Sequence, residues 1–256
     1  KNQKVYLDLR HLGIDKIKEL MPQERRLAYD YSNIKIEEQL LPISPASHYS
    51  MGGIKTDINA RTNIRNLFAC GECAEASIHG ANRLGGNSLL EIVTFGKIAG
   101  INASNDEKNI GEINTSTKYA KEDEENINKI YNYSNKINFY KQKDDIGNLL
   151  FNNLGLFRNE EKISTLIKKI KELNLEIENM GIADKSKTYN KNLVEFLEFR
   201  NILNVALLVS ISALNRKESR GSHFRLDYPL ERQEYEKNTI IKKLDNKIIV
   251  EFEEIV

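Results

Sequence analysis

Glycine is unevenly distributed along this chain, and that distribution constrains the fold more than any other feature of the sequence. Eight of the 14 glycines fall within residues 46–104. Because glycine permits tight turns and close approach of backbones, we expect turns and short strands there. Residues 105–220 contain few glycines, are rich in lysine, glutamate and asparagine, and show helical periodicity. The two regions therefore predict different architectures within one α+β chain.

Composition and charge exclude several classes of protein. The 256 residues are enough for one large domain or two smaller ones. A net charge of +1 argues against a nucleic-acid partner, which normally requires a strong basic excess. The longest apolar run near the end, residues 205–209, is far shorter than the roughly 20 residues of a membrane span. No apolar segment follows the first residues, so no signal peptide is visible. Two cysteines argue against a secreted disulfide scaffold.

Periodicity and turn residues predict a series of elements. In chain order they are a strand at 5–9, helices at 13–20 and 22–31, a hairpin of 51–57 with 62–64, a buried strand at 67–70, a helix from 88, helices over 163–177 and 193–214, and a hairpin of 239–244 with 248–252. The helix over 193–214 is apolar on most sides, which is typical of the centre of a bundle. Residues 102–114 are the expected linker.

Cys70 and Cys73 form a C-x-x-C pair with three interpretations. The pair could be a redox dithiol or half of a zinc site. Zinc would need two further ligands at suitable spacing, and the four histidines form no H-x-x-x-H pair. We therefore favour two small residues that flank a turn, and we predict no metal site.

Glu72 follows the predicted strand 67–70 directly after a glycine. Ligands of α/β sheets bind at the carboxyl ends of strands. An acidic side chain at such a position can accept hydrogen bonds from sugar or ribityl hydroxyls, although a solvated turn residue is the commoner case.

Residues 79–91, HGANRLGGNSLLE, are the strongest motif. Arg83 lies in a glycine-rich loop that leads into a helix, and Ser88 with Glu91 has the spacing of a capping box. The planar fork of an arginine holds a carboxylate through two parallel hydrogen bonds. A helix start offers N–H groups and partial positive charge to an anion or an electron-rich carbonyl. This loop is therefore our main candidate for ligand binding.

Two further segments are open to interpretation. His48 precedes the glycine turn at Gly52 and Gly53, and its value as a ligand-binding residue depends on whether it meets Arg83 in space. A lone histidine is more often structural.

Residues 216–225 form a basic cluster after the long helix. This position favours a capping and docking segment, because cations are stabilised at helix C-termini.

Four motifs occur in a characteristic order: residues 48–54 (HYSMGGI), 71–72 (GE), 79–91 and 216–223 (RKESRGSH). In this respect the chain closely resembles the C-terminal half of the flavoprotein subunit of succinate dehydrogenase and fumarate reductase, a family that includes L-aspartate oxidase. The resemblance implies a capping-domain remnant at 1–45 and the C-terminal part of a Rossmann-like FAD-binding domain at 46–104. It implies a helical domain at 105–220 and a small C-terminal region at 221–256.

The resemblance also implies roles for individual residues. Glu72 matches the acid that binds the ribityl chain of FAD. The helix start at Asn87, Ser88 and Leu89 matches the one that lies against the flavin pyrimidine and stabilises negative charge on the reduced ring. His48 and Arg83 match the residues that hold the carboxylates of a C4 dicarboxylate, succinate or fumarate, while hydride moves to or from flavin N5.

Parts of the family's site have no counterpart here. The chain contains no G-x-G-x-x-G dinucleotide fingerprint. The histidine that bonds covalently to FAD and the proton-donating arginine lie upstream in the family, so we assign no catalytic residue. The chain also has no initiator methionine. We therefore expect a C-terminal fragment of a longer subunit, with little turnover of its own.

The resemblance leaves the branch of the family open. Met51 and Gly86 are typical of the dehydrogenases and reductases, whereas residues 219–229 look like an L-aspartate oxidase ending. The tail from Glu231 onward favours the respiratory subunit again. That subunit would work with an iron–sulfur partner and a membrane anchor, as a peripheral protein on the cytoplasmic face of the inner membrane. A non-catalytic fragment that only docks the iron–sulfur subunit is the remaining alternative.

Overall fold

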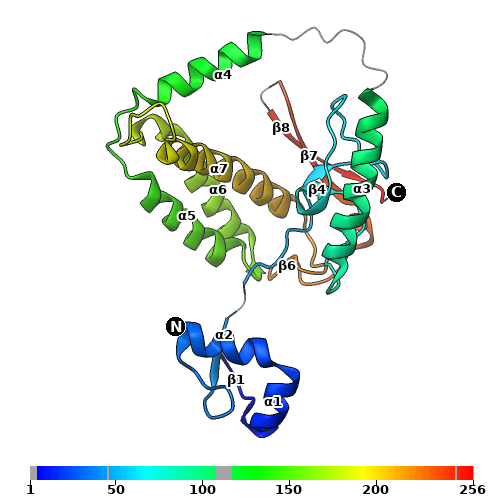
Figure 1. The fold of residues 1–256 in the computed structure, drawn as a ribbon. Coiled ribbons are helices and arrows are strands. Elements are labelled where there is room, and N and C mark those ends of the chain that lie inside the picture. The colour runs from blue at the N-terminus through cyan, green and yellow to red at the C-terminus, as the bar shows by residue number, and fades with distance from the viewer. Residues whose placement is uncertain (1–4, 45, 108–116, 246, 256) are drawn as a thin grey trace. The chain divides into compact units, whose positions relative to one another are not determined.

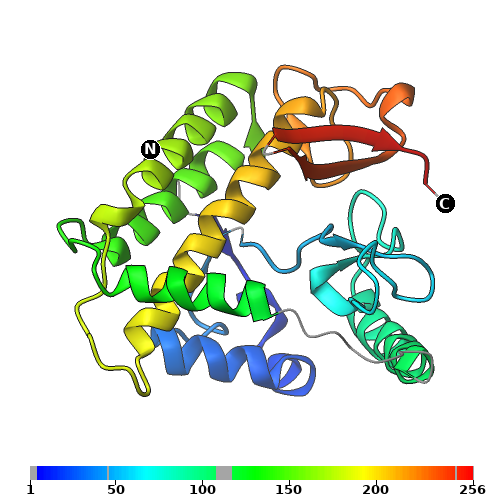
Figure 2. The ribbon, with the colours of Figure 1, turned by 90° about the horizontal axis from the view of Figure 1, so that it is seen from above.

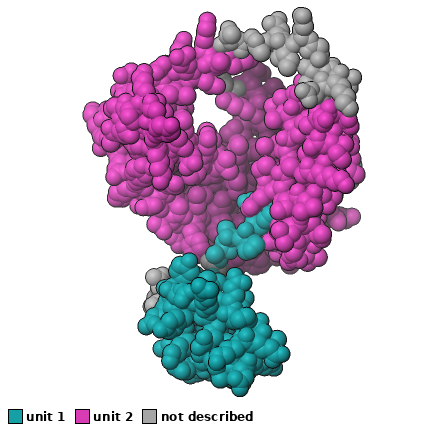
Figure 3. All heavy atoms as spheres, viewed as in Figure 1, with its two compact units in different colours: residues 1–50 teal, residues 51–256 magenta. Residues whose placement is uncertain are grey.

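The structure, a computed structural model, describes residues 5–44, 46–107, 117–245 and 247–255. The chain divides into two compact units, Lys1–Ser50 and Met51–Val256 (Figures 1 and 3). Both helices and short paired strands are present, which confirms the mixed character of the predicted fold. The finer division into four domains stays a prediction.

The first unit is a small helical motif closed by two strands. Its elements are β1 (Val5–Leu7), η1 (Arg10–Leu12), α1 (Ile14–Leu20), α2 (Pro22–Ser32) and β2 (Leu41–Ile43). β1 pairs antiparallel with β2, with Tyr6 opposite Pro42. Pro22 occupies the start of α2, where its missing N–H costs nothing. The predicted strand and both predicted helices are confirmed, and a small core joins them: Leu9, Ile17, Ala28 and Ile36.

The glycine-rich part of the second unit is built differently from the expectation. Its elements are β3 (Ile54–Lys55), η2 (Gly71–Cys73), β4 (Ala74–Glu75) and α3 (Asn87–Glu107). The predicted hairpin of 51–57 with 62–64 is wrong, because β3 pairs in parallel with β4. Asp57 instead closes a turn by accepting the backbone N–H of Arg61 at 2.8 Å. The predicted strand 67–70 is reduced to a bridge between Arg61 and Phe68.

Gly53 shows why glycine is needed in this region. An ideal Cβ at this position would lie 2.3 Å from the carbonyl oxygen of Cys73, which is backbone and cannot swing away. Only a residue without a side chain allows β3 to approach the start of β4 so closely. The predicted close backbone approach is confirmed at this position.

The helical part contains α4 (Thr117–Ile130), α5 (Phe139–Leu154), α6 (Glu160–Leu175), η3 (Ile177–Asn179) and α7 (Lys191–Asn215). Figure 2 shows α5, α6 and α7 packed side by side. Their apolar faces form one core, in which the rings of Phe139 and Phe196 meet edge to face at 5.3 Å. Asn190 caps α7 by accepting the Leu193 N–H at 2.8 Å. The two long predicted helices are confirmed.

α7 has the length and composition of a membrane-crossing helix, which the short apolar runs in the sequence did not indicate. Packing accounts for part of this composition, since 28% of the apolar stretch of α7 is buried. Phe196, Phe199 and Leu203 are fully buried in the core shared with α5 and α6. A central helix of a bundle meets the same criterion as a membrane span, because it is apolar around most of its circumference.

The C-terminal elements contact both the helical part and the glycine-rich part of the second unit. They are β6 (Phe224–Arg225), η4 (Gln233–Tyr235), β7 (Asn238–Leu244) and β8 (Lys247–Glu253), and a further strand, β5 (Phe157–Arg158), lies between α5 and α6. β5 pairs in parallel with β6, and β7 with β8 forms the predicted antiparallel hairpin. The Asn238 amide donates to the Ser77 hydroxyl at 2.6 Å, so this region is bonded to the glycine-rich part.

The expected linker at 102–114 is partly wrong. α3 continues to Glu107 and therefore includes its first residues, and the helix crosses the boundary expected between 104 and 105. Residues 108–116 lie outside the described residues.

Candidate functional site

The start of α3 is the centre of the candidate site. The helix begins at Asn87, and the Gly86 carbonyl accepts the Leu89 N–H at 3.1 Å. Ser88 therefore lies inside the first turn, so its predicted role as the N-cap of a capping box is wrong. The amide groups of a first turn lack partners within the helix and carry partial positive charge. Leu89 is 66% exposed beside them, so this end of the helix is accessible.

Glu91 contacts the residue at the other end of the same motif. Its carboxylate oxygen Oε2 lies 2.8 Å from Nε2 of His79, and the two side chains are 2% and 10% exposed. This buried pair fixes the beginning of the 79–86 loop to the body of α3. Sequence reasoning missed His79, although the histidine and the glutamate stand at the two ends of the same motif.

Arg83 lies directly against the helix start. Its Nη1 donates to the Ser88 hydroxyl and to the Leu84 carbonyl, each at 3.3 Å. Arg83 is half-buried. The structure thus brings together Arg83 and the three residues predicted to contact the cofactor, Asn87, Ser88 and Leu89.

Glu72 is held near the same helix by the turn η2. Gly71 has a φ of +76°, and an ideal Cβ there would lie 3.2 Å from Cγ2 of Ile92. The glycine therefore lets η2 pack closely on α3, while Glu72 itself is exposed. The role of Glu72 in binding the ribityl chain stays a prediction.

His48 belongs to the other compact unit, Lys1–Ser50. Its predicted convergence with Arg83 therefore stays a prediction. The side chain is exposed within the structure as described.

Cys70 and Cys73 are both free thiols, and Sγ of Cys73 lies 3.4 Å from the Cys70 carbonyl oxygen. Among the described residues, no group of three or more histidine, cysteine, aspartate or glutamate side chains could hold a metal ion. The zinc interpretation of this pair therefore has no support in that part of the chain.

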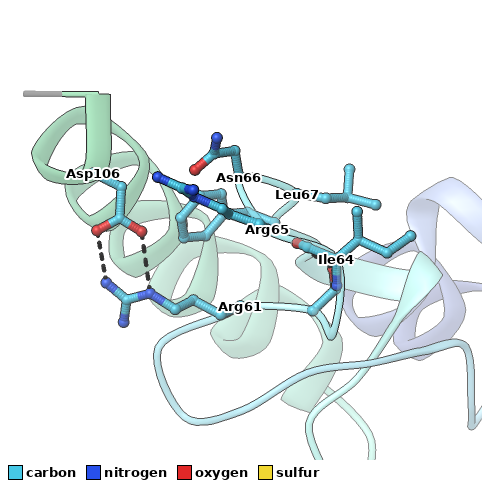
Figure 4. Close-up of a pocket in the computed structure, with 8 residues that line it drawn as sticks. Arg61, Ile64, Arg65, Asn66, Leu67 and Asp106 are labelled. Atoms are coloured by element: carbon cyan, nitrogen blue, oxygen red, sulfur yellow. Dashed lines mark hydrogen bonds and ion pairs between the residues drawn. The ribbon is translucent and has the colours of Figure 1, made fainter. Parts of the chain in front are cut away.

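A separate pocket of about 270 Å³ lies at the other end of α3 (Figure 4). The Arg61 guanidinium pairs there with Asp106, with 3.1 Å between Nη2 and Oδ1. An α-helix rises about 1.5 Å per residue, so almost the full length of α3 separates Asp106 from Asn87. None of the predicted site residues lines this pocket, and we exclude it from the candidate site.

The basic cluster at 216–225 is a buried ion-pair network rather than a simple capping segment. Glu218 has no exposed side-chain surface, and it accepts from Arg220 at 3.0 and 3.1 Å, from the Arg232 N–H at 2.9 Å, and from Arg216. Burial acts to raise the pKa of the Glu218 carboxyl, but these hydrogen bonds and positive charges leave it below its ordinary value. Glu218 is therefore ionised and fully paired.

Arg225 forms a second buried contact set beside the first. Its side chain is 0% exposed, pairs with Asp227 at 2.7 Å, and donates to the carbonyls of Ala213 and Leu214 at the end of α7. The docking role that we predicted for this segment is consistent with these contacts. Their burial was not visible in the sequence.

His223 sits within this positive cluster. Its Nδ1 accepts from Nη1 of Arg158 at 2.8 Å, and its Nε2 donates to the Arg216 carbonyl at 3.1 Å, so the hydrogen-bond network assigns the neutral Nε2–H tautomer. Burial, reinforced by the charges of Arg158, Arg216 and Arg225, lowers the pKa of His223 to about 4.

The buried state of His223 predicts a pH-dependent stability. Between its ordinary pKa of 6.5 and about 4, the unfolded chain binds a proton that the folded protein does not. The free energy of unfolding should therefore fall as the pH drops through this window, by about 2 kcal/mol after allowance for partial exposure. Urea unfolding at several pH values measures this loss. The H223Q variant cannot titrate at this position, so its free energy of unfolding should change less with pH above about pH 4. An unchanged pH dependence in H223Q would contradict the lowered pKa of His223.

The residues at the start of α3 fit the isoalloxazine end of FAD. Ideal Cβ atoms at Gly85 and Gly86 would meet no atom within 4 Å, so the backbone leading into the helix is open to a flat ring. An exposed carboxylate from Glu72 and the N–H groups of the first turn are suitable partners for hydroxyls and a ring carbonyl. The donor set is therefore consistent with the predicted cofactor.

Comparisons with known proteins agree with this arrangement. A family model for the C-terminal part of the fumarate reductase flavoprotein matches residues 143–256, and one for an FAD binding domain matches residues 1–89. The fumarate reductase flavoprotein subunit of Escherichia coli (strain K12) is 40% identical over 225 residues, which are 87% of this chain and 37% of that protein. The succinate dehydrogenase flavoprotein subunit of Coxiella burnetii is 33% identical over 245 residues, which are 89% of this chain and 41% of that protein.

Solved structures give the same result. Escherichia coli quinol fumarate reductase matches with a TM-score of 0.93 at 36% identity, over 98% of this chain and 44% of that chain. Succinate dehydrogenase 1 of Mycobacterium smegmatis matches with a TM-score of 0.85 at 26% identity, over 98% of this chain and 43% of that chain. The chain thus spans less than half the length of the relatives it matches. It belongs to the family of FAD-containing flavoprotein subunits of fumarate reductase and succinate dehydrogenase.

Proposed function

We propose that this chain is the substrate-binding and flavin-contacting part of an FAD-dependent subunit that interconverts succinate and fumarate. The observation that carries the proposal is the packing of Arg83 against the start of α3, where Nη1 of the arginine meets the Ser88 hydroxyl at 3.3 Å. This contact supports the proposal, because the planar fork of an arginine can bind a carboxylate and Arg83 lies next to the helix start that we propose for the flavin ring. A redox cofactor and an anionic substrate could therefore lie side by side.

Four residues would hold the cofactor. Glu72 would accept hydrogen bonds from the ribityl hydroxyls, and Asn87, Ser88 and Leu89 would present the helix start to the pyrimidine ring. When bound, FAD would supply the redox chemistry by accepting or donating a hydride at N5. The positive end of α3 would stabilise negative charge near that ring, as expected of a protein environment that tunes a cofactor.

Two residues would hold the substrate. Arg83 would bind one carboxylate of the C4 dicarboxylate through two parallel hydrogen bonds, and His48 would donate a hydrogen bond to the substrate. Fixing the carboxylates places the carbon that exchanges hydride, which lowers the entropic part of the barrier. We assign the proton donor to the part of the relatives that this chain does not span.

The names of relatives suggest the partners. One relative is the 8-methylmenaquinol:fumarate reductase flavoprotein subunit of Wolinella succinogenes, which is 37% identical over 235 residues. We infer that electrons pass between this subunit and a quinone through an iron–sulfur subunit and a membrane anchor. We place the subunit as a peripheral protein on the cytoplasmic face of the inner membrane.

Assays of the full-length subunit test this proposal against its alternatives. We expect fumarate reduction by a reduced viologen dye and succinate oxidation by a dye acceptor, with little oxidation of L-aspartate. Faster oxidation of L-aspartate than of succinate would identify an L-aspartate oxidase instead. A flavin-free subunit that still binds its iron–sulfur partner would support a docking role alone.

The chain of 256 residues by itself is expected to bind FAD weakly or not at all. The reason is that its sequence contains no G-x-G-x-x-G turn to hold the pyrophosphate. Flavin absorbance after gel filtration of the chain with added FAD measures this directly, with the full-length subunit as the positive control. Stoichiometric flavin on the isolated chain would overturn the expectation.

A further inference from the structure

A tight turn at Arg220–His223 touches the loop that carries Arg83. The turn is closed by two backbone hydrogen bonds between Arg220 and His223, at 2.8 and 3.0 Å. At its tip, the Ser222 N–H donates to the Ala81 carbonyl at 3.2 Å, and the Ser222 hydroxyl approaches the same oxygen at 3.4 Å. The two segments are 141 residues apart in the sequence, so this contact joins distant parts of the unit.

Gly221 makes the contact possible. Its φ is +56°, and an ideal Cβ would lie 2.3 Å from the Ala81 carbonyl oxygen and 2.7 Å from the Ala81 Cβ. Both the backbone conformation and the lack of space therefore require glycine. Any side chain at this position would push the two segments apart.

The turn itself is firmly anchored. Arg220 is bonded to the fully buried Glu218, and the His223 ring is held between the Arg158 guanidinium and the Arg216 carbonyl. A segment held in this way cannot shift without breaking the Arg220–Glu218 ion pair or the hydrogen bonds of His223. The turn is therefore a fixed support for the loop that contains Ala81.

The supported loop is short. Ala81 lies two positions before Arg83, and the loop is also fixed at its start by the His79–Glu91 pair and at its end by the contact of Arg83 with Ser88. The turn adds a third point of attachment between these two. The backbone leading into Arg83 is therefore located by the C-terminal region as well as by α3.

We propose that the Arg220–His223 turn is a positioning element for Arg83, acting through Gly221 and Ser222 on the Ala81 carbonyl. The proposal rests on the proposed function, in which Arg83 binds a substrate carboxylate. A bidentate grip depends on the position of the guanidinium, because a displacement of about 1 Å can cost a large factor in rate. The turn would keep Arg83 in place when no substrate is bound, without itself touching substrate.

The test is Gly221→Ala in the full-length, FAD-loaded enzyme. We expect the KM for fumarate and the dissociation constant of malonate, a dicarboxylate that cannot be desaturated, to rise by about tenfold. Flavin content should stay unchanged. Gly13→Ala is the matched control, because Gly13 has a φ of +74° but its Cβ would meet nothing within 4 Å. Gly13→Ala adds a Cβ at a positive φ without the contact, and should leave malonate binding unchanged.

A double-mutant cycle with Arg83→Lys separates positioning from a general structural effect. If Gly221 acts through Arg83, adding Gly221→Ala to Arg83→Lys should change the malonate dissociation constant by less than about twofold. Multiplicative effects of the two substitutions, or normal malonate binding by Gly221→Ala, would overturn the proposal. Unchanged kinetics in Arg83→Lys alone would instead show that the proposed function is wrong.

A milder variant keeps the proposal testable if Gly221→Ala fails to fold. Ser222→Ala preserves the backbone and removes only the hydroxyl next to the Ala81 carbonyl. It should weaken malonate binding by about twofold to threefold, and this effect should disappear in the Arg83→Lys background. An effect that persists in that background would contradict the proposal.

Discussion

Replacing Arg83 with lysine in the complete subunit should lower kcat/KM for both succinate and fumarate by more than about tenfold, while FAD content stays near normal. Lysine keeps the positive charge but loses the planar fork that forms two parallel hydrogen bonds with a carboxylate. Loss of one partner of a buried charge pair typically costs about 2–5 kcal/mol, and each 1.4 kcal/mol is a factor of ten. Steady-state kinetics in both directions, with flavin absorbance per protein, provide the measurement.

Arg65→Lys is the matched control for this substitution. Arg65 is an exposed arginine in the same unit and lines the pocket at the far end of α3. It should leave the kinetics unchanged. Equal kinetics for Arg83→Lys and the wild type would refute the assigned role, as would an experimental structure of the complete subunit in which His48 and Arg83 face opposite sides.

Glu218→Ala should be the most destabilising single substitution in the C-terminal region, with a loss of about 3–5 kcal/mol in the free energy of unfolding. The carboxylate is fully buried and is bonded to Arg216, Arg220 and the Arg232 backbone. Its removal leaves two guanidinium groups, only 14% and 22% exposed, without their main partner. Urea unfolding followed by far-UV circular dichroism measures the change.

Glu231→Ala is an internal control for the Glu218 prediction. Glu231 pairs with the same arginine, Arg220, at 3.6 Å, but its side chain is 65% exposed. A surface ion pair contributes at most about 1 kcal/mol, so this variant should be nearly as stable as the wild type. Similar losses for the two variants would mean that burial does not set the energy of this network.

The sequence predicted those parts of the fold that depend on local patterns. The helices around Pro22, over α6 and over α7 follow from a helix-starting proline and from apolar periodicity. The β7–β8 hairpin follows from two apolar runs around a short turn. In the glycine-rich part the prediction was wrong where pairing is non-local. β3 pairs with β4 although residues 56–73 separate the two strands, and nothing in residues 51–57 alone specifies that partner.

In the candidate site, too, local features could be predicted from the sequence and non-local contacts could not. The clustering of Arg83 with the helix start was predictable, because the residues are neighbours in the chain. The buried pair of Glu91 with His79 was missed, because burial cannot be judged from spacing. The ion pairs of Glu218 were missed for a related reason, since charged residues are mostly exposed and the sequence does not show which are covered. The distance from His48 to Arg83 stays a prediction.

The contact between Ser222 and Ala81 has a consequence for the order of events during synthesis. A ribosome makes the Arg83 loop well before the turn that supports it, since 141 residues separate the two contacts. At roughly 5–20 residues per second, the loop would wait many seconds for its support. The loop that carries Arg83 would therefore gain its contact with Ser222 only after residues 216–223 have left the exit tunnel, late relative to its own synthesis.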